Sequence, residues 1–278
     1  MNKKNYIKSP LVYTGCKYKL LEQIIPLFPY NINTFYDLFG GSGTVVANVN
    51  ANNYIYNELN LKIKDLIEWI STCDGKQEVK NIMEEINKFN LSKGNKEKYY
   101  IFRREYNESP SNIWLFILAC FSLNYSIRFN SKGEFNQSCG NRAFSDNIKN
   151  NFISFNNKMK NSNVKYINSS FDSFKNFKKN DFVYLDPPYL PTVVAYTENG
   201  GWNEEKERNM YNYIDWLNSI NVKFALSNVS IYRNKENTIL QDWMKKYNIY
   251  NLNFKYKNNN FNKKDNTAFT QEVLITNY

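Results

Sequence analysis

Thr34-Phe-Tyr-Asp-Leu-Phe39-Gly40-Gly41-Ser42-Gly43 is the part of the sequence that predicts the architecture of the chain. It is typical of a short apolar strand that enters a glycine-rich turn, and we expect a helix to begin near Thr44. Glycines let the backbone approach a ligand closely, so strand, glycine turn and helix form the first unit of a Rossmann-like nucleotide site. A glycine turn is also often only a turn, so by itself it does not establish a ligand site.

A second strand, Tyr54-Ile-Tyr-Asn57, ends at Glu58, which lies 18 residues after Gly40. An acid near this distance, at the end of the second strand, accepts hydrogen bonds from ribose hydroxyls. The glycine turn and the acid together predict a nucleotide-type ligand, with NAD and S-adenosylmethionine (SAM) both open at this point. No Gly-Lys-Ser or Gly-Lys-Thr follows the turn, which disfavours a P-loop and phosphoryl transfer.

The tetrapeptide Asp186-Pro187-Pro188-Tyr189 closes the apolar, β-rich run 181–185. It therefore sits at the carboxyl end of an expected buried parallel strand, where open α/β sheets bind their ligands. Two prolines remove two backbone donors and leave carbonyls free beside a carboxylate and an aromatic face. An isolated Pro-Pro pair usually just ends a strand, but with Asp before it and Tyr after it the segment suits an amino group on a flat ring.

The composition bounds the class of protein. A chain of 278 residues can hold one α/β core with an insertion, and we prefer this to two independent domains. The net charge of +10 suits a polyanionic partner, although an A/T-rich genome also encodes many lysines. No long apolar run or signal peptide is evident, so we expect a cytoplasmic protein.

The chain contains no histidine, which removes Ser-His-Asp and Cys-His catalysis and histidine metal ligands in one step. The four cysteines are widely spaced without a CxxC pair, so the sequence indicates neither a zinc site nor a disulfide framework. We expect reduced thiols and no metal.

Between the second and third expected strands, residues 73–160 show a mostly helical pattern. Within this stretch, a Lys-Gly turn at Lys132 separates two polar, aromatic-bearing arms that run from Asn124 to Arg142. We interpret the arms as a hairpin that touches DNA. After this insert we expect strands at 164–167, 181–185 and 222–226, a helix capped by Asn203, a helix near 237–247, and a terminal hairpin at about 249–256 and 270–276.

These segments together resemble the Dam-type adenine-N6 DNA methyltransferases of the amino-methyltransferase family, in particular the phage-type branch. The resemblance covers nearly the whole chain and rests on six segments in family order: Tyr13-Thr-Gly-Cys-Lys17, Asp37-Leu-Phe-Gly-Gly41, the acid Glu58, the helical insert, Asp186-Pro-Pro-Tyr189 and Leu226-Ser-Asn228. It implies an α/β, Rossmann-like SAM-dependent methyltransferase core, with a mostly parallel sheet and a C-terminal antiparallel hairpin. Residues 1–72 and 161–278 would form this core, and residues 73–160 would form a target-recognition insert with a β-hairpin.

The resemblance also assigns residues to roles. The catalytic residues would be Asp186, Pro187 and Tyr189. The SAM site would be lined by Tyr13, Lys17, Phe39, Gly40, Glu58, Phe171 and Asp186. Double-stranded DNA would be contacted by Lys17, Arg128, Asn130, Lys132, Arg142 and Tyr196. The implied enzyme flips an adenine out of a short duplex site and works without metal as a monomer or weak dimer. Restriction-modification is its expected context, and whether it is paired with a restriction nuclease or acts alone stays open.

Departures from the family pattern leave alternatives open. Cys16 replaces a small or amide residue, and Glu58 stands where Asp is usual. Ser126 and Ser138 stand where apolar residues usually touch thymine, so a relaxed or altered A/T-rich site stays open beside GATC, the target that the resemblance implies.

Two further questions stay open at the level of sequence. Leu123 and Tyr125 are the candidates for the residue that wedges into the duplex. The competing functions are a catalytically inactive DNA-binding protein on the same fold, a nicotinamide oxidoreductase, and a methyltransferase that acts on protein or RNA.

Overall fold

The computed structural model describes residues 5–13, 15–190, 201–253 and 269–278. The chain forms two compact units. The first unit comprises residues 1–18, 41–48 and 60–166, and the second comprises residues 19–40, 49–59 and 167–278. The division of the chain into a catalytic core and a recognition insert stays a prediction.

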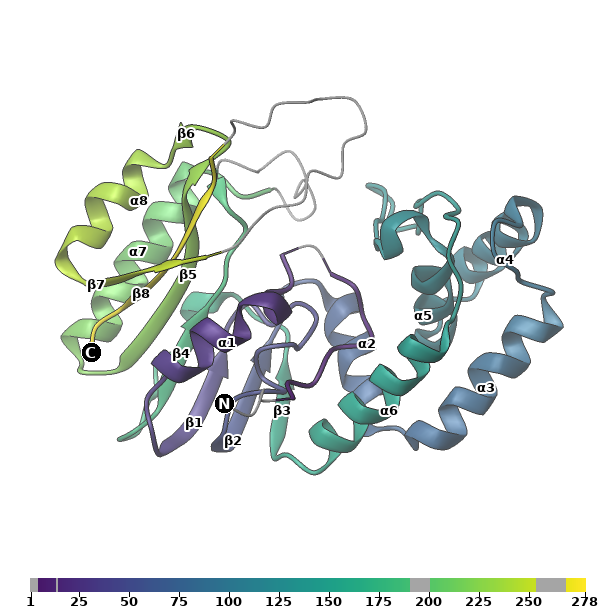
Figure 1. Ribbon diagram of the computed structural model, residues 1–278, viewed down its shortest axis with the longest axis horizontal. Helices are drawn as coiled ribbons and strands as arrows, with labels where there is room; N and C mark the ends of the chain where they lie inside the picture. Colours follow the sequence, from purple (N-terminus) through teal and green to yellow (C-terminus); the bar gives the residue numbers. More distant parts are fainter. Residues whose placement is uncertain (1–4, 14, 191–200, 254–268) are drawn as a thin grey trace. The chain divides into compact units, whose positions relative to one another are not determined.

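Eight strands of the described chain form one sheet with the order β3-β2-β1-β4-β5-β8-β7, and β6 pairs with β5 (Figure 1). The strands are β1 (Ile32–Asp37), β2 (Ala51–Asn57), β3 (Val164–Ile167), β4 (Phe182–Leu185), β5 (Lys223–Tyr232), β6 (Lys235–Glu236), β7 (Asn248–Leu252) and β8 (Gln271–Thr276). The predicted strands are all present, with bounds that differ by a few residues. β5 runs on past its predicted end at residue 226, and residues 254–256 of the predicted terminal strand lie outside the described residues.

Strand β1 marks the point where the strand order reverses. It pairs in parallel with β2 on one side and with β4 on the other. β5 continues the parallel arrangement beside β4, and β8 then pairs antiparallel with both β5 and β7. This confirms a Rossmann-like, mostly parallel sheet with an antiparallel C-terminal pair. Ligands of such sheets bind beyond the carboxyl ends of the strands at the reversal, here β1 and β4.

Both faces of β4 are buried, which explains its continuous apolar sequence. Val183 and Leu185 belong to the cluster that packs under α7 (Glu204–Ser219) and α8 (Thr238–Trp243). Phe182 and Tyr184 point the other way, against Phe28, which follows the short helix α1 (Leu21–Ile24) and the 3-10 turn Ile25–Leu27. Asn203 caps α7 through a 2.9 Å bond from the Lys206 N–H, as predicted.

The prediction of a helix near Thr44 is wrong, because the chain there forms only turns. The Ala47 N–H donates to Gly43 O at 3.1 Å and the Asn48 N–H to Val45 O at 2.9 Å, and β2 begins at Ala51. The connection is too short for a full helix. Asn48 also donates from its side-chain amide to the Thr44 carbonyl at 2.8 Å, which closes the turn locally.

The helices of the first unit fulfil the helical pattern seen in the sequence (Figure 1). They are α2 (Leu61–Thr72), α3 (Gly75–Lys88), α4 (Lys96–Glu108), α5 (Asn112–Phe121) and α6 (Asp146–Lys160). Side chains of Asn60, Asp74, Asn95 and Ser111 cap the first four. Within the described ranges, none of the helices combines the length and the hydrophobicity that crossing a membrane requires.

The expected β-hairpin between Asn124 and Arg142 is only partly formed. Phe129 and Phe135 form an isolated antiparallel bridge between its arms, Ser122 and Cys139 form another at its base, and no regular strand forms among its described residues. The arms are polar and lack the alternating apolar pattern of a strand. A few backbone bonds join them, such as the Asn136 N–H to Arg128 O at 3.0 Å, and side-chain hydrogen bonds add to these.

Candidate functional site

Asp186 and Tyr189 lie directly beyond the carboxyl end of β4. Leu185 is fully buried, whereas Asp186 is half-buried and Pro187 is buried, so the strand delivers the carboxylate from the core to the edge of the sheet. The Tyr189 hydroxyl donates to Asp186 Oδ1 at 3.1 Å. A carboxylate has about four acceptor sites, so it can take several donors at once. The structure thus brings the two predicted residues together and adds a bond that the sequence did not reveal.

The glycine turn begins beside this segment. The Leu38 N–H donates to Tyr184 O at 3.0 Å, and the Gly40 N–H donates to Asn57 O at 2.8 Å. A Cβ atom at Gly40 would lie 2.3 to 2.9 Å from ring carbons of Tyr56, so only glycine fits there. Packing against the buried Tyr56 ring therefore fixes the backbone at Gly40.

Asn57 holds the ends of neighbouring segments in place, a role that was not predicted from the sequence. Its side-chain amide donates to Leu38 O at 2.9 Å and to Ser169 O at 3.0 Å, while its Oδ1 accepts the Ser169 N–H at 3.1 Å. The residue is 1% exposed, so these bonds satisfy a buried amide. An asparagine as the last residue of a parallel strand is the signal that could have revealed it.

Glu58 follows Asn57 at the end of β2, where the sequence predicts a ribose acceptor. Its N–H donates to Ile167 O at 3.1 Å. The Asn168 side chain donates to the carbonyls of Glu58 and Leu59, each at 2.8 Å. The backbone of the acid is therefore fixed on both sides, at the same edge of the sheet as Gly40.

Three aromatic rings gather beside the glycine turn. Phe39 and Phe171, both predicted to line the cofactor site, stack with their centroids 5.6 Å apart. Trp202, which was not among the predicted site residues, meets Phe39 edge-on at 5.8 Å and lies 6.4 Å from Phe171. Aromatic walls suit a flat purine or a cation, and the nearby acid suits a ribose, so the side chains present fit SAM.

Tyr13 and Lys17 belong to the first unit, where their turn packs on the rest of the glycine-rich loop. Cys16 Sγ lies 3.2 Å from Thr44 Oγ1. Lys17 is 3% exposed, and its ammonium donates to Gly15 O at 3.0 Å. The roles of Tyr13 and Lys17 in binding SAM, and of Lys17 in contacting DNA, remain predictions.

Side chains define the candidate DNA-reading loop of the first unit. Arg128 is exposed and donates from Nε to Asn136 Oδ1 at 2.8 Å and from its Nη2 to Asn136 O at 3.3 Å. The Asn130 carboxamide oxygen accepts the backbone N–H groups of Lys132 and Glu134 at 3.0 and 2.9 Å, which closes the loop tip. Asn130 and Lys132 therefore shape and flank the turn between the arms.

Helix α4 holds the returning arm of this loop. Asn107 pairs with the backbone of Phe135 in both directions, at 2.8 and 3.1 Å. Tyr99 and Arg103 both donate to Gln137 O, at 3.1 and 3.2 Å. These bonds fix an irregular backbone that no strand ladder supports.

The second predicted arginine, Arg142, is exposed and stacks over the Tyr125 ring with 5.0 Å between the guanidinium carbon and the ring centroid. Ser126 bonds with Gln137, so its hydroxyl belongs to the internal network of the loop. Ser138 is exposed. Tyr196, also predicted to contact DNA, lies outside the described residues.

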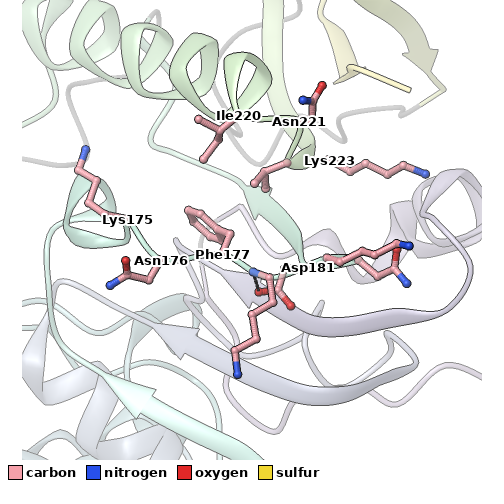
Figure 2. A pocket seen from close by; sticks show the side chains of 11 residues that line it. Lys175, Asn176, Phe177, Asp181, Ile220, Asn221 and Lys223 are labelled. Atoms are coloured by element: carbon pink, nitrogen blue, oxygen red, sulfur yellow. Dashed lines mark hydrogen bonds between the residues drawn. The ribbon is translucent and has the colours of Figure 1, made fainter.

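A pocket of about 690 Å³ opens at the amino ends of β4 and β5, the edge opposite Asp186 (Figure 2). Lysines dominate its rim, and Asp181 is the acidic residue that lines it. Asp181 accepts bonds from the Asn33 amide at 2.7 Å and the Lys178 N–H at 2.8 Å, and burial together with Asp181 raises the pKa of Tyr36 to about 12. The Asp181 carboxylate thus holds the start of β1 beside the segment that enters β4. None of the predicted site residues lines this pocket.

Across the described residues, no group of three or more His, Cys, Asp or Glu side chains is arranged to hold a metal ion. The residues at the carboxyl edge of the sheet are the acids Asp186 and Glu58, the two prolines, Tyr189 and the aromatic rings beside the glycine turn.

The chain matches a known protein family over the same segments. The model of the D12 class N6 adenine-specific DNA methyltransferases matches residues 13–273. The chain belongs to this family. The matched span includes the glycine turn, the acid Glu58 and Asp186-Pro-Pro-Tyr189, and the family is one of enzymes that methylate adenine in DNA.

Two relatives align along almost the whole chain. The chain is 42% identical over 285 residues to the modification methylase StsI of Streptococcus sanguinis, and 40% identical over 282 residues to the type II methyltransferase M.FokI of Planomicrobium okeanokoites. Each alignment covers 99% of this chain and 43% of the relative, so the chain spans less than half of their length. The chain is also 24% identical over 282 residues to the type II methyltransferase M1.LlaDCHI of Lactococcus lactis subsp. cremoris, and this alignment covers 96% of the chain and 94% of that relative.

Proposed function

We propose that this chain transfers a methyl group from SAM to N6 of an adenine in double-stranded DNA, within a restriction-modification system. One observation carries the proposal: Asp186-Pro-Pro-Tyr189 follows β4, and the glycine turn follows the adjacent strand β1, at the reversal of the strand order. The names of the relatives StsI and M.FokI, a modification methylase and a type II methyltransferase, favour the restriction-modification context.

SAM, when bound, would supply an electrophilic methyl group on a sulfonium: the methyl–sulfur bond would break as the methyl carbon joins N6, and S-adenosyl-L-homocysteine would leave as the product. We assign its binding to Tyr13, Lys17, Phe39, Gly40, Glu58, Phe171 and Asp186. The Glu58 carboxylate would accept hydrogen bonds from the ribose hydroxyls, and the aromatic pair Phe39 and Phe171 would supply apolar walls. Trp202 extends these walls.

Adenine N6 is a weak nucleophile because its lone pair is delocalised into the ring, and inside a duplex it is also paired and stacked. The base must therefore leave the helix. Asp186 and the Pro187 carbonyl would then accept the two N6 hydrogens, which would localise the lone pair on N6 toward the methyl group. Tyr189, held beside the carboxylate by its bond to Oδ1, stacks on the ring. Positive charge develops on N6, Asp186 stabilises it, and one N6 proton then leaves to water.

DNA recognition is assigned to residues 73–160, and SAM binding and catalysis to residues 1–72 and 161–278. Arg128 and Arg142 are exposed arginines held by neighbours, an arrangement suited to bidentate contact with guanine O6 and N7. We propose a GATC site or a related A/T-rich site. Lys17, Asn130, Lys132 and Tyr196 would then also contact the DNA, with Asn130 and Lys132 near its phosphates.

The test is to incubate the chain with unmethylated duplex DNA and SAM, and to analyse the digested nucleosides by mass spectrometry. We expect N6-methyldeoxyadenosine, formed only when both SAM and the chain are present. Methyl groups on cytosine N4, or on protein or RNA in place of DNA, would contradict the substrate. DNA binding without any methyl transfer would favour the competing function, an inactive DNA-binding protein on the same fold.

A further inference from the structure

Glu207 is a fully buried acid in the first turns of α7, and the proposed methyl transfer does not use it. Within the described residues its carboxylate accepts from four side chains: Trp202, Tyr211, Asn228 and Asn237. Burying a carboxylate is costly unless donors replace its water, so these bonds are what allow an acid in this place.

The two oxygens of this carboxylate serve different neighbours. Oε1 accepts from the Tyr211 hydroxyl, from Asn228 at 3.2 Å and from Asn237 at 3.3 Å. Tyr211 lies in α7, Asn228 in β5, and Asn237 caps α8, so Oε1 joins three elements of the core. Burial and the adjacent Glu207 carboxylate raise the pKa of Tyr211 far above its usual range, which keeps this hydroxyl a donor.

Oε2, in contrast, accepts from the indole N–H of Trp202. Trp202 is 7% exposed and contacts Phe39 and Phe171, the aromatic pair beside Gly40. An indole has one donor and a large apolar ring, so a fixed acceptor at the N–H determines where the ring lies. Glu207 Oε2 thus bonds to Trp202, the side chain that lines the candidate cofactor site.

We propose that Glu207 is a positioning residue for the cofactor pocket, acting through Trp202 to hold the indole against Phe39 and Phe171. This inference rests on the proposed function, because it takes the aromatic pair as part of the SAM site. Loss of the Oε2 contact frees the indole and weakens SAM binding.

The experiment measures SAM affinity by calorimetric titration for the wild type, Glu207→Gln, Trp202→Phe and the double variant, below their unfolding temperatures. The matched control is Tyr211→Phe, which removes a donor to Oε1 and leaves the Trp202 contact intact. We expect Glu207→Gln and Trp202→Phe each to weaken SAM affinity by about fivefold or more, and Tyr211→Phe to lower Tm with SAM affinity within about twofold of wild type.

The double variant identifies the route. If Glu207 acts through Trp202, Glu207→Gln adds no further loss in the Trp202→Phe background. SAM affinity within about twofold of wild type in folded Glu207→Gln, or an equal loss in Tyr211→Phe, would overturn the proposal. If Glu207→Gln does not fold, Trp202→Phe still tests the premise that the indole walls the SAM site, and unchanged SAM affinity there overturns the proposal. A wild type that binds no SAM at all would instead refute the proposed function and this inference with it.

Discussion

At the scale of single residues, the candidate site depends on side chains that bond to backbone at strand ends. Phe39, Gly40, Glu58 and Asp186 could be predicted because each follows an apolar, β-rich run, and parallel strands bring their carboxyl ends to one edge. Asn57 escaped prediction, since its bonds depend on which segments become neighbours in space.

Trp202 and Glu207 escaped prediction for a related reason, although their spacing carries a signal. Trp202 is the residue before the N-cap of α7, and Glu207 is the fourth residue of the helix. In many helices apolar side chains at these two positions pack together as a hydrophobic staple. Here the pair is an indole and a carboxylate. A polar version of that contact is invisible to a search for apolar periodicity.

Replacing Glu58 by alanine tests the ribose acceptor. The ribose hydroxyls would lose a charged acceptor, and we expect SAM affinity to fall about tenfold or more, which corresponds to about 1.5–3 kcal/mol. Calorimetric titration measures the change, and Glu205→Ala, an exposed acid in the same unit, is the control. Equal affinities of wild type and Glu58→Ala would show that the second-strand acid does not bind the ribose.

Replacing Asn57 by alanine tests the bonds that organise the strand ends. The variant removes the 2.9 Å bond to the buried Leu38 carbonyl and the 3.0 Å bond to the partly buried Ser169 carbonyl. We expect the free energy of unfolding, measured in urea, to fall by about 1–3 kcal/mol. The exposed Asn209→Ala is the control, and a variant as stable as that control would show that other donors replace Asn57.

At the scale of elements, sequence patterns located the strands better than the connections. β3 and β4 follow from their apolar runs, and α7 follows from its cap and apolar face. The turn at Thr44 was mistaken for a helix because a glycine turn usually precedes one. The candidate DNA-reading loop, residues 124–142, was expected to be a regular hairpin. Side-chain hydrogen bonds of Asn107 and Asn130 help to fix it, and the spacing of apolar residues in the sequence does not reveal such bonds.

Two arginines of the candidate DNA-reading loop lead to a prediction about which DNA sequence is methylated. A bidentate arginine contact supplies about 1–3 kcal/mol of discrimination, so Arg128→Ala and Arg142→Ala should relax methylation at guanine positions of the site. Methylome sequencing of DNA modified by each variant and by the exposed control Arg104→Ala measures this. If neither variant relaxes methylation at any guanine position, these arginines contact phosphates and do not read bases.

At the scale of the whole molecule, the excess of positive charge predicts how DNA binding responds to salt. With a net charge of +10, contacts to several phosphates release counterions, so DNA affinity should fall steeply between about 50 and 200 mM salt. SAM affinity, measured in the same buffers, should change far less. If DNA affinity does not change across this range, the positive charges are solvated at the surface and do not contact the DNA phosphates.

The whole molecule acts as a methyltransferase only if Asp186 promotes attack by adenine N6, and the rate of transfer from tritiated SAM to unmethylated duplex DNA measures this step. For Asp186→Ala we expect a loss of at least about a hundredfold, because the developing charge on N6 loses its fixed partner. DNA affinity, measured in parallel, should persist because it comes from basic residues elsewhere. Transfer by Asp186→Ala within about tenfold of the wild-type rate would contradict the catalytic role of this carboxylate.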